Sequence, residues 1–230
     1  MRPIVESLNG VTLIGGGPVG RRELMQALRR APDVVAVDGG ADAALAAGLN
    51  PLAVIGDFDS ISDAARAAID PARLHPIPEQ ATTDFDKALR SVTAPFVLGV
   101  GFQGARLDHG LAALNTMLRR PDRTCLLLGP ADVIFHAPPR LRLTLAPGDR
   151  LSLFPMRSVT GQSRGLHWPI DGLDFAPDGM IGTSNRVCES AVELMFDGPG
   201  MIVILPRARL DSALRALVPG WRAPRAARVG

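Results

Sequence analysis

Two aspartates separated by a single residue are the feature of this sequence that most directly suggests chemistry. Asp57 and Asp59 lie in the segment from Gly56 to Ser60, directly after an apolar run. In an extended chain residues i and i+2 point to the same side, so we expect both carboxylates to face one place, with Phe58 packed behind them. Two like charges so close repel unless a cation or a proton lies between them, and Mg²⁺ prefers such oxygen ligands. The alternative is a solvated turn in which one aspartate caps the next helix.

The segment from Glu79 to Lys87 contains a second cluster of polar residues. Thr83 or Asp84 is placed to cap the helix that follows, which is the structural alternative to a role in ligand binding. The phase of Asp86 places it on the helix, so we expect an Asp86→Asn substitution to change the activity little. Lys87 is the only lysine among the 25 basic residues, so a Schiff-base enzyme would have to use it. No Gly-rich loop ends in Lys-Ser/Thr, which excludes a P-loop nucleotide site.

A third cluster begins with a Gly-rich turn at residues 101–104 and leads into the start of a predicted helix. Arg106 suits phosphate recognition because its guanidinium is planar and permanently charged. Asp108 and His109 suggest an acid–base pair, and the alternative is that His109 is only a structural neighbour of the site. This turn therefore offers an arginine for phosphate beside a histidine whose role the sequence leaves open.

Glycines follow the first two apolar runs of the chain. The segment from Gly15 to Pro18 would let backbone N–H groups approach phosphate oxygens, although a tight strand-to-helix turn explains it without a ligand. Asp38, which precedes Gly39, is equally suited to cap a helix or to bind a ligand. No acidic residue other than Asp38 ends the second predicted strand, where a dinucleotide dehydrogenase binds the ribose, which argues against that class of enzyme. The four clusters together favour phosphoryl-type transfer directed by Mg²⁺.

The elements that must position these clusters alternate between short apolar runs and Ala/Leu-rich stretches up to about residue 135. Because each cluster follows a predicted strand, and ligands bind beyond the carboxyl ends of parallel strands, we expect the clusters to meet at one edge of a sheet. The pattern predicts an α/β fold with a Rossmann-like, mostly parallel sheet. The predicted strands are 11–14, 34–37, 52–55, 96–100 and 124–128, and the predicted helices are 41–47, 62–69, 84–92, 107–119 and one ending near residue 30.

The second half of the chain has a different pattern. Residues 140–145 and 150–154 alternate with period two, and Gly-containing turns separate them from apolar segments at 187–196 and 201–205. This pattern predicts a small antiparallel β-sandwich domain, followed by one helix at about 210–217. We therefore expect an α/β domain at 1–136, a β domain at 137–218 and a flexible tail at 219–230.

Composition narrows the class of protein further. Hydrophobic residues make up 47% and charged residues 21% of the 230 positions, which is typical of a globular protein. No apolar stretch approaches the length of a membrane-spanning helix, and the first residues lack the apolar core of a signal peptide. The two cysteines give no disulfide framework. We expect a cytoplasmic protein that binds neither membranes nor nucleic acid, since no aromatic residues interleave with the arginines of the tail.

The ordered motifs resemble those of the thiamin pyrophosphokinase family over about residues 10–206. The resemblance implies a Rossmann-like catalytic domain, a thiamin-binding β domain, a homodimer, and Mg²⁺-dependent transfer of diphosphate from ATP to thiamin with release of AMP. The motifs that carry it are Asp38-Gly39-Gly40-Ala41, Gly56-Asp57-Phe58-Asp59-Ser60, Thr83-Asp84-Phe85, Arg106-Leu107-Asp108-His109, Gly165-Leu166-His167-Trp168-Pro169-Ile170 and Gly182-Thr183-Ser184-Asn185.

The resemblance also implies roles for individual residues. Asp57, Asp59 and Asp84 would hold Mg²⁺ and the ATP phosphates, and either Asp59 or Asp84 would accept the proton of the thiamin hydroxyl. The implied substrate-binding residues are Trp168 and Ser184, which contact thiamin from the partner subunit, and Asn185, which more plausibly holds the loop. The implied catalytic residues are Asp57, Asp59, Asp84, Arg106 and Asp108, and the implied ATP-binding residues are Asp38, Gly39, Gln80, Thr83, Asp84 and Arg106.

At two positions the chain departs from the family pattern. Ala81 stands where an acidic residue is usual, which puts one contact around the metal or its water in doubt. Ala113 stands where Asn is usual, one turn after the histidine, and this departure concerns support of the helix. Two alternatives to the thiamin reaction remain: a diphosphokinase for another small alcohol such as a pterin, and a non-catalytic homologue that only binds nucleotide or thiamin.

Overall fold

A parallel sheet forms the first half of the molecule. The computed structural model describes residues 2–104 and 106–224. Six parallel strands lie in the order β8-β7-β2-β3-β4-β5, and all four residues of β2, β4, β7 and β8 are buried, so both faces of the sheet are covered. The strands are β2 (Val11–Ile14), β3 (Asp33–Val37), β4 (Ala53–Gly56), β5 (Leu74–Pro76), β7 (Val97–Val100) and β8 (Cys125–Leu128).

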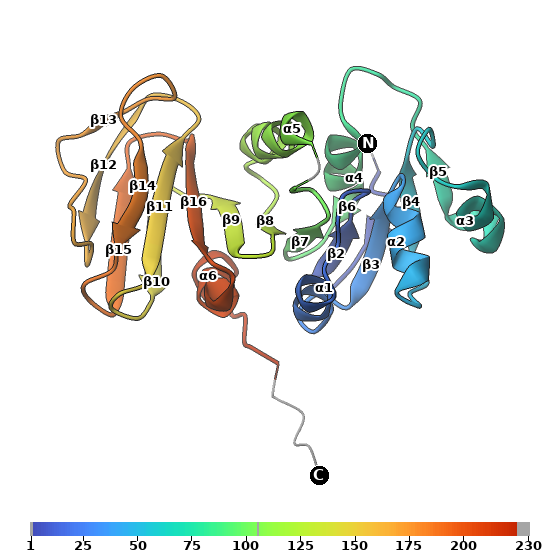
Figure 1. Ribbon diagram of the computed structural model, residues 1–230, viewed down its shortest axis with the longest axis horizontal. Coiled ribbons are helices and arrows are strands. Elements are labelled where there is room, and N and C mark those ends of the chain that lie inside the picture. Colours follow the sequence, from blue (N-terminus) through green and yellow to red (C-terminus); the bar gives the residue numbers. More distant parts are fainter. Residues whose placement is uncertain (1, 105, 225–230) are drawn as a thin grey trace, which may run out of the picture.

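Helices connect these strands and pack against them (Figure 1). The helix after β5 shows why such segments fold locally: Thr83 caps its N-terminus, and Phe85 and Leu89 are buried on the side that packs against the sheet. The elements are α1 (Arg21–Leu28), α2 (Gly40–Ala46), α3 (Asp63–Ala68), the 3₁₀ turn η1 (Pro71–Arg73), α4 (Asp84–Ser91) and α5 (Leu107–Arg119). A short ladder pairs β1 (Val5–Glu6) with β6 (Val92–Thr93).

The parallel sheet continues without a break into the second half of the chain. β9 (Asp132–His136) pairs antiparallel with β8 and with β16 (Met201–Pro206), and β11 (Arg150–Pro155) and β14 (Gly182–Arg186) complete a sheet of ten strands. A second sheet of four antiparallel strands belongs to the same half. Its order is β10-β15-β12-β13, from β10 (Arg140–Thr144), β15 (Ala191–Phe196), β12 (Val159–Arg164) and β13 (Asp174–Phe175).

These observations confirm the predicted α/β class with an antiparallel second half. The predicted boundary at residue 136 coincides with the end of β9, but the ten-stranded sheet crosses it, so the limits of two separate domains stay a prediction. In the predicted tail, Trp221 packs against the core, whereas residues 225–230 lie outside the described residues. None of the described helices has the length and apolar character that crossing a membrane requires.

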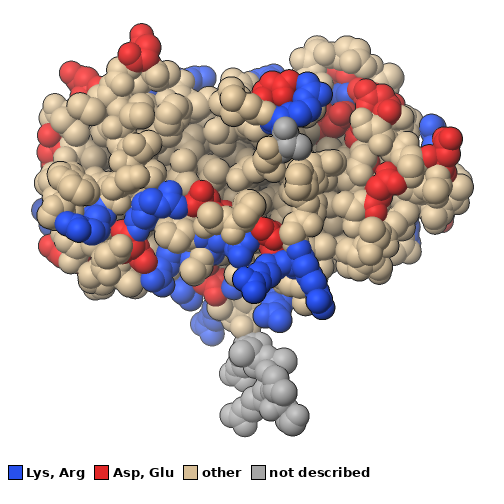
Figure 2. Space-filling model, in the orientation of Figure 1, with Lys and Arg blue, Asp and Glu red and all other residues tan. Residues whose placement is uncertain are grey.

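The last helix ties the two halves together. η2 (Arg207–Arg209) and α6 (Leu210–Leu217) follow β16, and their charged side chains reach α1. Arg207 Nη1 lies 3.0 Å from Glu23 Oε1, and Asp211 pairs with Arg30. Figure 2 shows basic side chains gathered in this part of the surface, whereas acidic side chains gather over the far end of the parallel sheet.

Candidate active site

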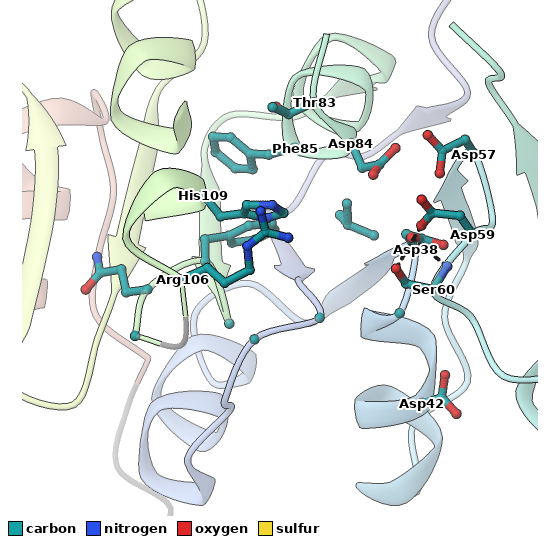
Figure 3. A pocket seen from close by; sticks show the side chains of 18 of the residues that line it. Asp38, Asp42, Asp57, Asp59, Ser60, Thr83, Asp84, Phe85, Arg106 and His109 are labelled. Carbon is teal, nitrogen blue, oxygen red and sulfur yellow. Dashed lines mark hydrogen bonds between the residues drawn. The ribbon is translucent and has the colours of Figure 1, made fainter. Parts of the chain in front are cut away.

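A cavity of about 710 Å³ lies at the carboxyl ends of the parallel strands, where the sequence predicts that the clusters meet. Figure 3 shows carboxylates gathered on one side of it, and Arg106 and His109, from the start of α5, on the other. Residues of all four predicted clusters line the cavity. The predicted site residues among them are Asp38, Gly39, Asp57, Asp59, Gln80, Thr83, Asp84 and Arg106.

A strained turn brings Asp57 and Asp59 together. The prediction of an extended chain here is wrong, because Phe58 has φ +67°, in the left-handed region that bulky residues rarely adopt. Phe58 packs against the core, and the guanidinium of Arg66 lies 5.5 Å from its ring centroid. Asp38 also has a positive φ, of +46°. Both carboxylates face the cavity, but packing around Phe58 directs them rather than strand alternation.

Three carboxylates form a group that fits a cation. Asp38, Asp57 and Asp59 each offer one oxygen within 4.8 Å of the others. Asp38 Oδ1 and Asp57 Oδ1 are buried and have no hydrogen-bond partner in the described part of the chain. Buried oxygens without donors are costly, and carboxylate oxygens are the ligands that hard divalent cations prefer. The donor set therefore fits Mg²⁺. The family resemblance implied Asp57, Asp59 and Asp84 as the metal ligands, whereas the group in the structure contains Asp38 with Asp57 and Asp59.

The environment of Asp38 makes its carboxyl unusually basic. Burial raises its pKa to about 6, helped by the hydrogen bond to Asp59 and by the negative charges of Asp84 and Asp59. The backbone N–H of Ser60 donates to Asp38 Oδ2 at 3.2 Å and opposes this rise. Negative charge is thus crowded in this cavity before any ligand binds.

Lys87 is the functional residue that the sequence analysis did not assign. Its side chain is buried, and Nζ donates to Asp84 Oδ1 at 2.8 Å and to Asp57 Oδ2 at 3.1 Å. Burial alone would raise the pKa of Asp57 and lower that of Lys87. The ion pairs outweigh burial, so the pKa of Asp57 is lowered and that of Lys87 is raised. The available signal was a lone lysine one helical turn after Asp84.

The expectation that Asp86 is an inert helix position is wrong. Its side chain is fully buried, and Arg120 donates to both of its oxygens at 2.9 and 3.0 Å. α4 packs against both the sheet and α5, so the side of the helix that bears Asp86 is covered as well. An Asp86→Asn substitution would leave Arg120 without its ionic partner and is unsuitable as a control.

Thr83 and Gln80 serve the carboxylates from the loop before α4. Thr83 Oγ1 accepts a hydrogen bond from Asp86 N at 3.3 Å, so it caps the helix and lines the cavity at once. Gln80 Nε2 donates to Asp57 Oδ2 at 3.2 Å. Beside Ala81, where an acidic residue is usual, Glu79 pairs with Arg90 Nη2 at 2.8 Å instead of joining the cluster.

Arg106 faces the carboxylates from the start of α5. It is exposed, and its Nη2 lies 2.6 Å from Asp108 Oδ2. Asp108 also accepts a hydrogen bond from the backbone N–H of His109 at 3.0 Å, so it orients the arginine rather than lining the cavity. Ala113, the second departure from the family pattern, is buried within α5.

A second pocket, of about 320 Å³, lies in the antiparallel half and is lined mainly by apolar and aromatic side chains. Trp168 is 54% exposed, and Asn185 holds its backbone: Oδ1 accepts from Trp168 N at 3.2 Å and Nδ2 donates to Trp168 O at 2.7 Å. Ser184 lines the pocket with φ +61°, and the guanidinium of Arg186 lies 5.6 Å from the Trp168 ring centroid. The hypothesis that Asn185 holds the loop therefore fits its contacts.

The two pockets lie in opposite halves of the folded molecule. The first adjoins β4 and α4, whereas the second adjoins β13 and β14, with the connecting strands β9 and β16 between them (Figure 1). Within one chain, the side chains of the second pocket therefore do not meet those of the first.

Both halves of the chain match models of known protein families. Residues 24–127 match the family described as thiamin pyrophosphokinase, catalytic domain, and residues 137–200 match its vitamin B1 binding domain. These two matches together cover well over half of the chain, in the order that the resemblance requires. The chain belongs to the thiamin pyrophosphokinase family. The cavity thus lies in the part that matches the catalytic domain, and Trp168 lies in the part that matches the vitamin-binding domain.

The curated relatives that match this chain include plant proteins. Thiamine pyrophosphokinase 1 of Arabidopsis thaliana is 27% identical over 135 residues, which is 52% of this chain and 51% of that protein. Thiamine pyrophosphokinase 1 of Oryza sativa subsp. japonica has the same identity and coverage. The match thus spans about half the length of the curated relatives.

Solved structures of thiamin pyrophosphokinases share the fold. The Candida albicans protein aligns with a TM-score of 0.72 at 15% identity, covering 86% of this chain and 89% of that one. The Geobacillus thermodenitrificans protein aligns with a TM-score of 0.69 at 22% identity, covering 86% and 96%. At such identities the likeness establishes the arrangement of both halves.

Proposed function

We propose that this chain transfers a diphosphate group from ATP to the hydroxyl of thiamin and releases AMP, in a Mg²⁺-dependent reaction. The observation that carries the proposal is the cavity itself. Buried carboxylate oxygens that have no partner among the described residues face an exposed arginine across a space large enough for a nucleotide, in a chain of this family. The relatives that match are named thiamine pyrophosphokinases, which supports the same substrates here.

The carboxylates and the arginine have different roles in the cavity. Asp38, Asp57 and Asp59 would hold Mg²⁺, which when bound supplies positive charge against the phosphate oxygens. Arg106 would bind the phosphate groups from the opposite wall, because its guanidinium is exposed and, among the described residues, pairs with Asp108 alone. These groups are already in place and stabilise charge that develops during transfer.

One carboxylate must accept the proton of the attacking hydroxyl. Asp59 and Asp84 are the two candidates, and both line the cavity. Asp84 Oδ1 is already engaged by Lys87, whereas Asp59 is exposed and bonded to the hydroxyl of Ser60 at 2.8 Å. Asp59 would also hold Mg²⁺, so both carboxylates stay candidates for the base.

The thiamin site would be completed by a second copy of the chain. Thiamin carries a cationic thiazolium ring, which an aromatic face attracts, and Trp168 presents such a face in an apolar pocket. The pocket and the carboxylates lie at opposite ends of one chain, so a shared site requires a partner subunit. Met180 and Ile181 beside Trp168 are 51% and 41% exposed, as expected for a surface that a partner covers.

Analysis of the products tests this function directly. Purified protein with ATP, thiamin and Mg²⁺ should form AMP and thiamin diphosphate in equal amounts, resolved by chromatography. Formation of ADP and thiamin monophosphate would contradict diphosphate transfer. Turnover of a pterin alcohol but not of thiamin would favour the other diphosphokinase, and thiamin binding without any turnover would favour a non-catalytic homologue.

A further inference from the structure

Lys87 is a buried charge for which the proposed reaction has no direct use. It does not line the cavity, yet its ammonium contacts two carboxylates that do, from different elements: Asp57 after β4 and Asp84 at the start of α4. We propose that Lys87 is a positioning residue, which holds one oxygen of each carboxylate and thereby keeps the second oxygen of Asp57 free for a divalent cation. The inference rests on the proposed function, since it concerns the metal of that reaction.

The two oxygens of Asp57 have opposite environments. Oδ2 accepts hydrogen bonds from Lys87 Nζ at 3.1 Å and from Gln80 Nε2 at 3.2 Å. Oδ1 is buried and accepts none from the residues that the structure describes. A carboxylate rotates about its terminal torsion with little preference, so two donors on one oxygen decide which oxygen remains available. Lys87 is the buried member of this pair of donors, and Gln80 the exposed one.

Lys87 also joins two elements that arrive at the cavity independently. It lies three residues after Asp84 on one turn of α4, while Asp57 lies thirty residues earlier in the chain. A buried ammonium is tolerated only where carboxylates pair with it, so the strand end and the helix start must stay close. The same residue therefore sets the spacing between Asp57 and Asp84 as well as the orientation of each.

A charge acting alone would have the opposite effect on cation binding. If Lys87 only adds positive charge, its removal strengthens the binding of a divalent cation to the remaining carboxylates. If it positions Asp57, its removal weakens that binding, because the free oxygen is no longer held near Asp38 and Asp59. The sign of the change separates the two roles.

The chain offers a matched control on the same helix. Asp86 of α4 is buried and forms a second ion pair, with Arg120 at the end of α5, and neither residue lines the cavity. Arg120→Met removes a cation that pairs with a carboxylate of α4, as Lys87→Met does, but Asp86 is not one of the proposed metal ligands. Both substitutions should lower the melting temperature, and only the one at Lys87 should change cation binding.

The experiment is a titration of the full chain with Mn²⁺, without ATP or thiamin, followed by the EPR signal of the free ion. For Lys87→Met we expect the dissociation constant to rise about tenfold or more, with no change for Arg120→Met. Lys87→Gln, which keeps an amide donor, should lie between Lys87→Met and the unsubstituted chain, and it replaces Lys87→Met if that variant does not fold by circular dichroism.

Two outcomes would overturn the inference. Unchanged or tighter Mn²⁺ binding by folded Lys87→Met or Lys87→Gln would overturn it alone and leave the proposed function standing. Absence of Mn²⁺ binding by the unsubstituted chain would overturn it together with the metal part of the proposed function, whereas product analysis tests the substrates separately.

Discussion

The cavity of the parallel half and the pocket beside Trp168 differ in how their side chains are held. In the cavity, Asp38 is buried, Asp57 is fixed by donors on one oxygen, and a strained turn at Phe58 directs the carboxylates. In the second pocket Asn185 holds the backbone of Trp168, while the ring is half exposed and lies near the guanidinium of Arg186. The carboxylates of the first site meet within one chain, whereas the second site leaves an aromatic side chain half exposed.

This difference agrees with what we propose each site binds. Charge in a reacting phosphate is best stabilised by groups that are held in place beforehand, so buried polar contacts and strain accumulate around the carboxylates. An aromatic face for an organic cation needs area and exclusion of water, which a covering surface supplies. The comparison predicts large, charge-dependent effects at the first site and smaller, substrate-selective effects at the second.

The largest effect is expected at the paired carboxylates. Asp57→Asn or Asp59→Asn keeps the size of the side chain but removes a negative charge from the group that fits Mg²⁺. We expect a loss of about 3 kcal/mol or more in transition-state stabilisation, measured as kcat/KM at limiting Mg²⁺. Asp63→Asn is the control, because Asp63 is exposed at the start of α3 and does not line the cavity. Near-normal activity in both variants would contradict the expectation that charge at the first site has the larger effect.

A smaller effect is expected on stability at Asp38. Its pKa is raised to about 6 in the folded chain, so the folded state binds the proton more tightly than the unfolded state. The free energy of unfolding therefore falls as pH rises from about 4 to 6. Above pH 6 the full loss of stability caused by ionisation of the buried Asp38 carboxyl is present. In metal-free buffer, Asp38→Asn should raise the free energy of unfolding at pH 8 by roughly 2 kcal/mol.

The gain at Asp38 should shrink as the pH falls from about 6 toward 4, where the aspartate is protonated in the folded state and about half protonated in the unfolded state. Urea unfolding at pH 4.5 and pH 8 measures this dependence. A gain of equal size at both pH values would show that packing, rather than the crowded negative charge, sets the effect.

The smallest effect is expected at Trp168. Trp168→Ala should weaken thiamin binding by about 1–2 kcal/mol, because a cation–π contact and buried area are lost. ATP binding should not change, since the carboxylates and Arg106 are untouched. Isothermal titration with each ligand measures both, and Met195→Ala, which removes another exposed side chain of the same half, is the control. Equal weakening of thiamin binding and ATP binding would contradict the assignment of the two ligands to separate sites.

Much of this arrangement could be predicted from the sequence, because strong periodicity and turn residues are local signals. The helices at 107–119 and 210–217 have the predicted bounds, and the polar clusters meet at the predicted edge of the sheet. The strands β5 and β9 were not predicted, since three residues ending in Pro76 and a short run before Ala137 carry little alternation.

The contacts inside the cavity could not be predicted, because they join residues far apart in the chain. Nothing local indicates that Phe58 adopts a left-handed conformation, which the surrounding packing imposes. The sequence shows a lone Lys87 but not its meeting with Asp57, and a polar Asp86 but not its burial against Arg120. Burial of polar side chains is decided by the tertiary structure and leaves no periodic signal.

The central claim is that the two sites act together only across two subunits, and subunit mixing tests it most directly. Trp168→Ala chains and Asp57→Asn chains are mixed in equal amounts after verified subunit exchange, and activity is measured at thiamin far below its KM. The account predicts recovery of up to about one quarter of the unsubstituted activity, because half the dimers are mixed and each has one intact site of two. Activity no higher than the average of the two separate variants would contradict it, since each chain would then build its own site.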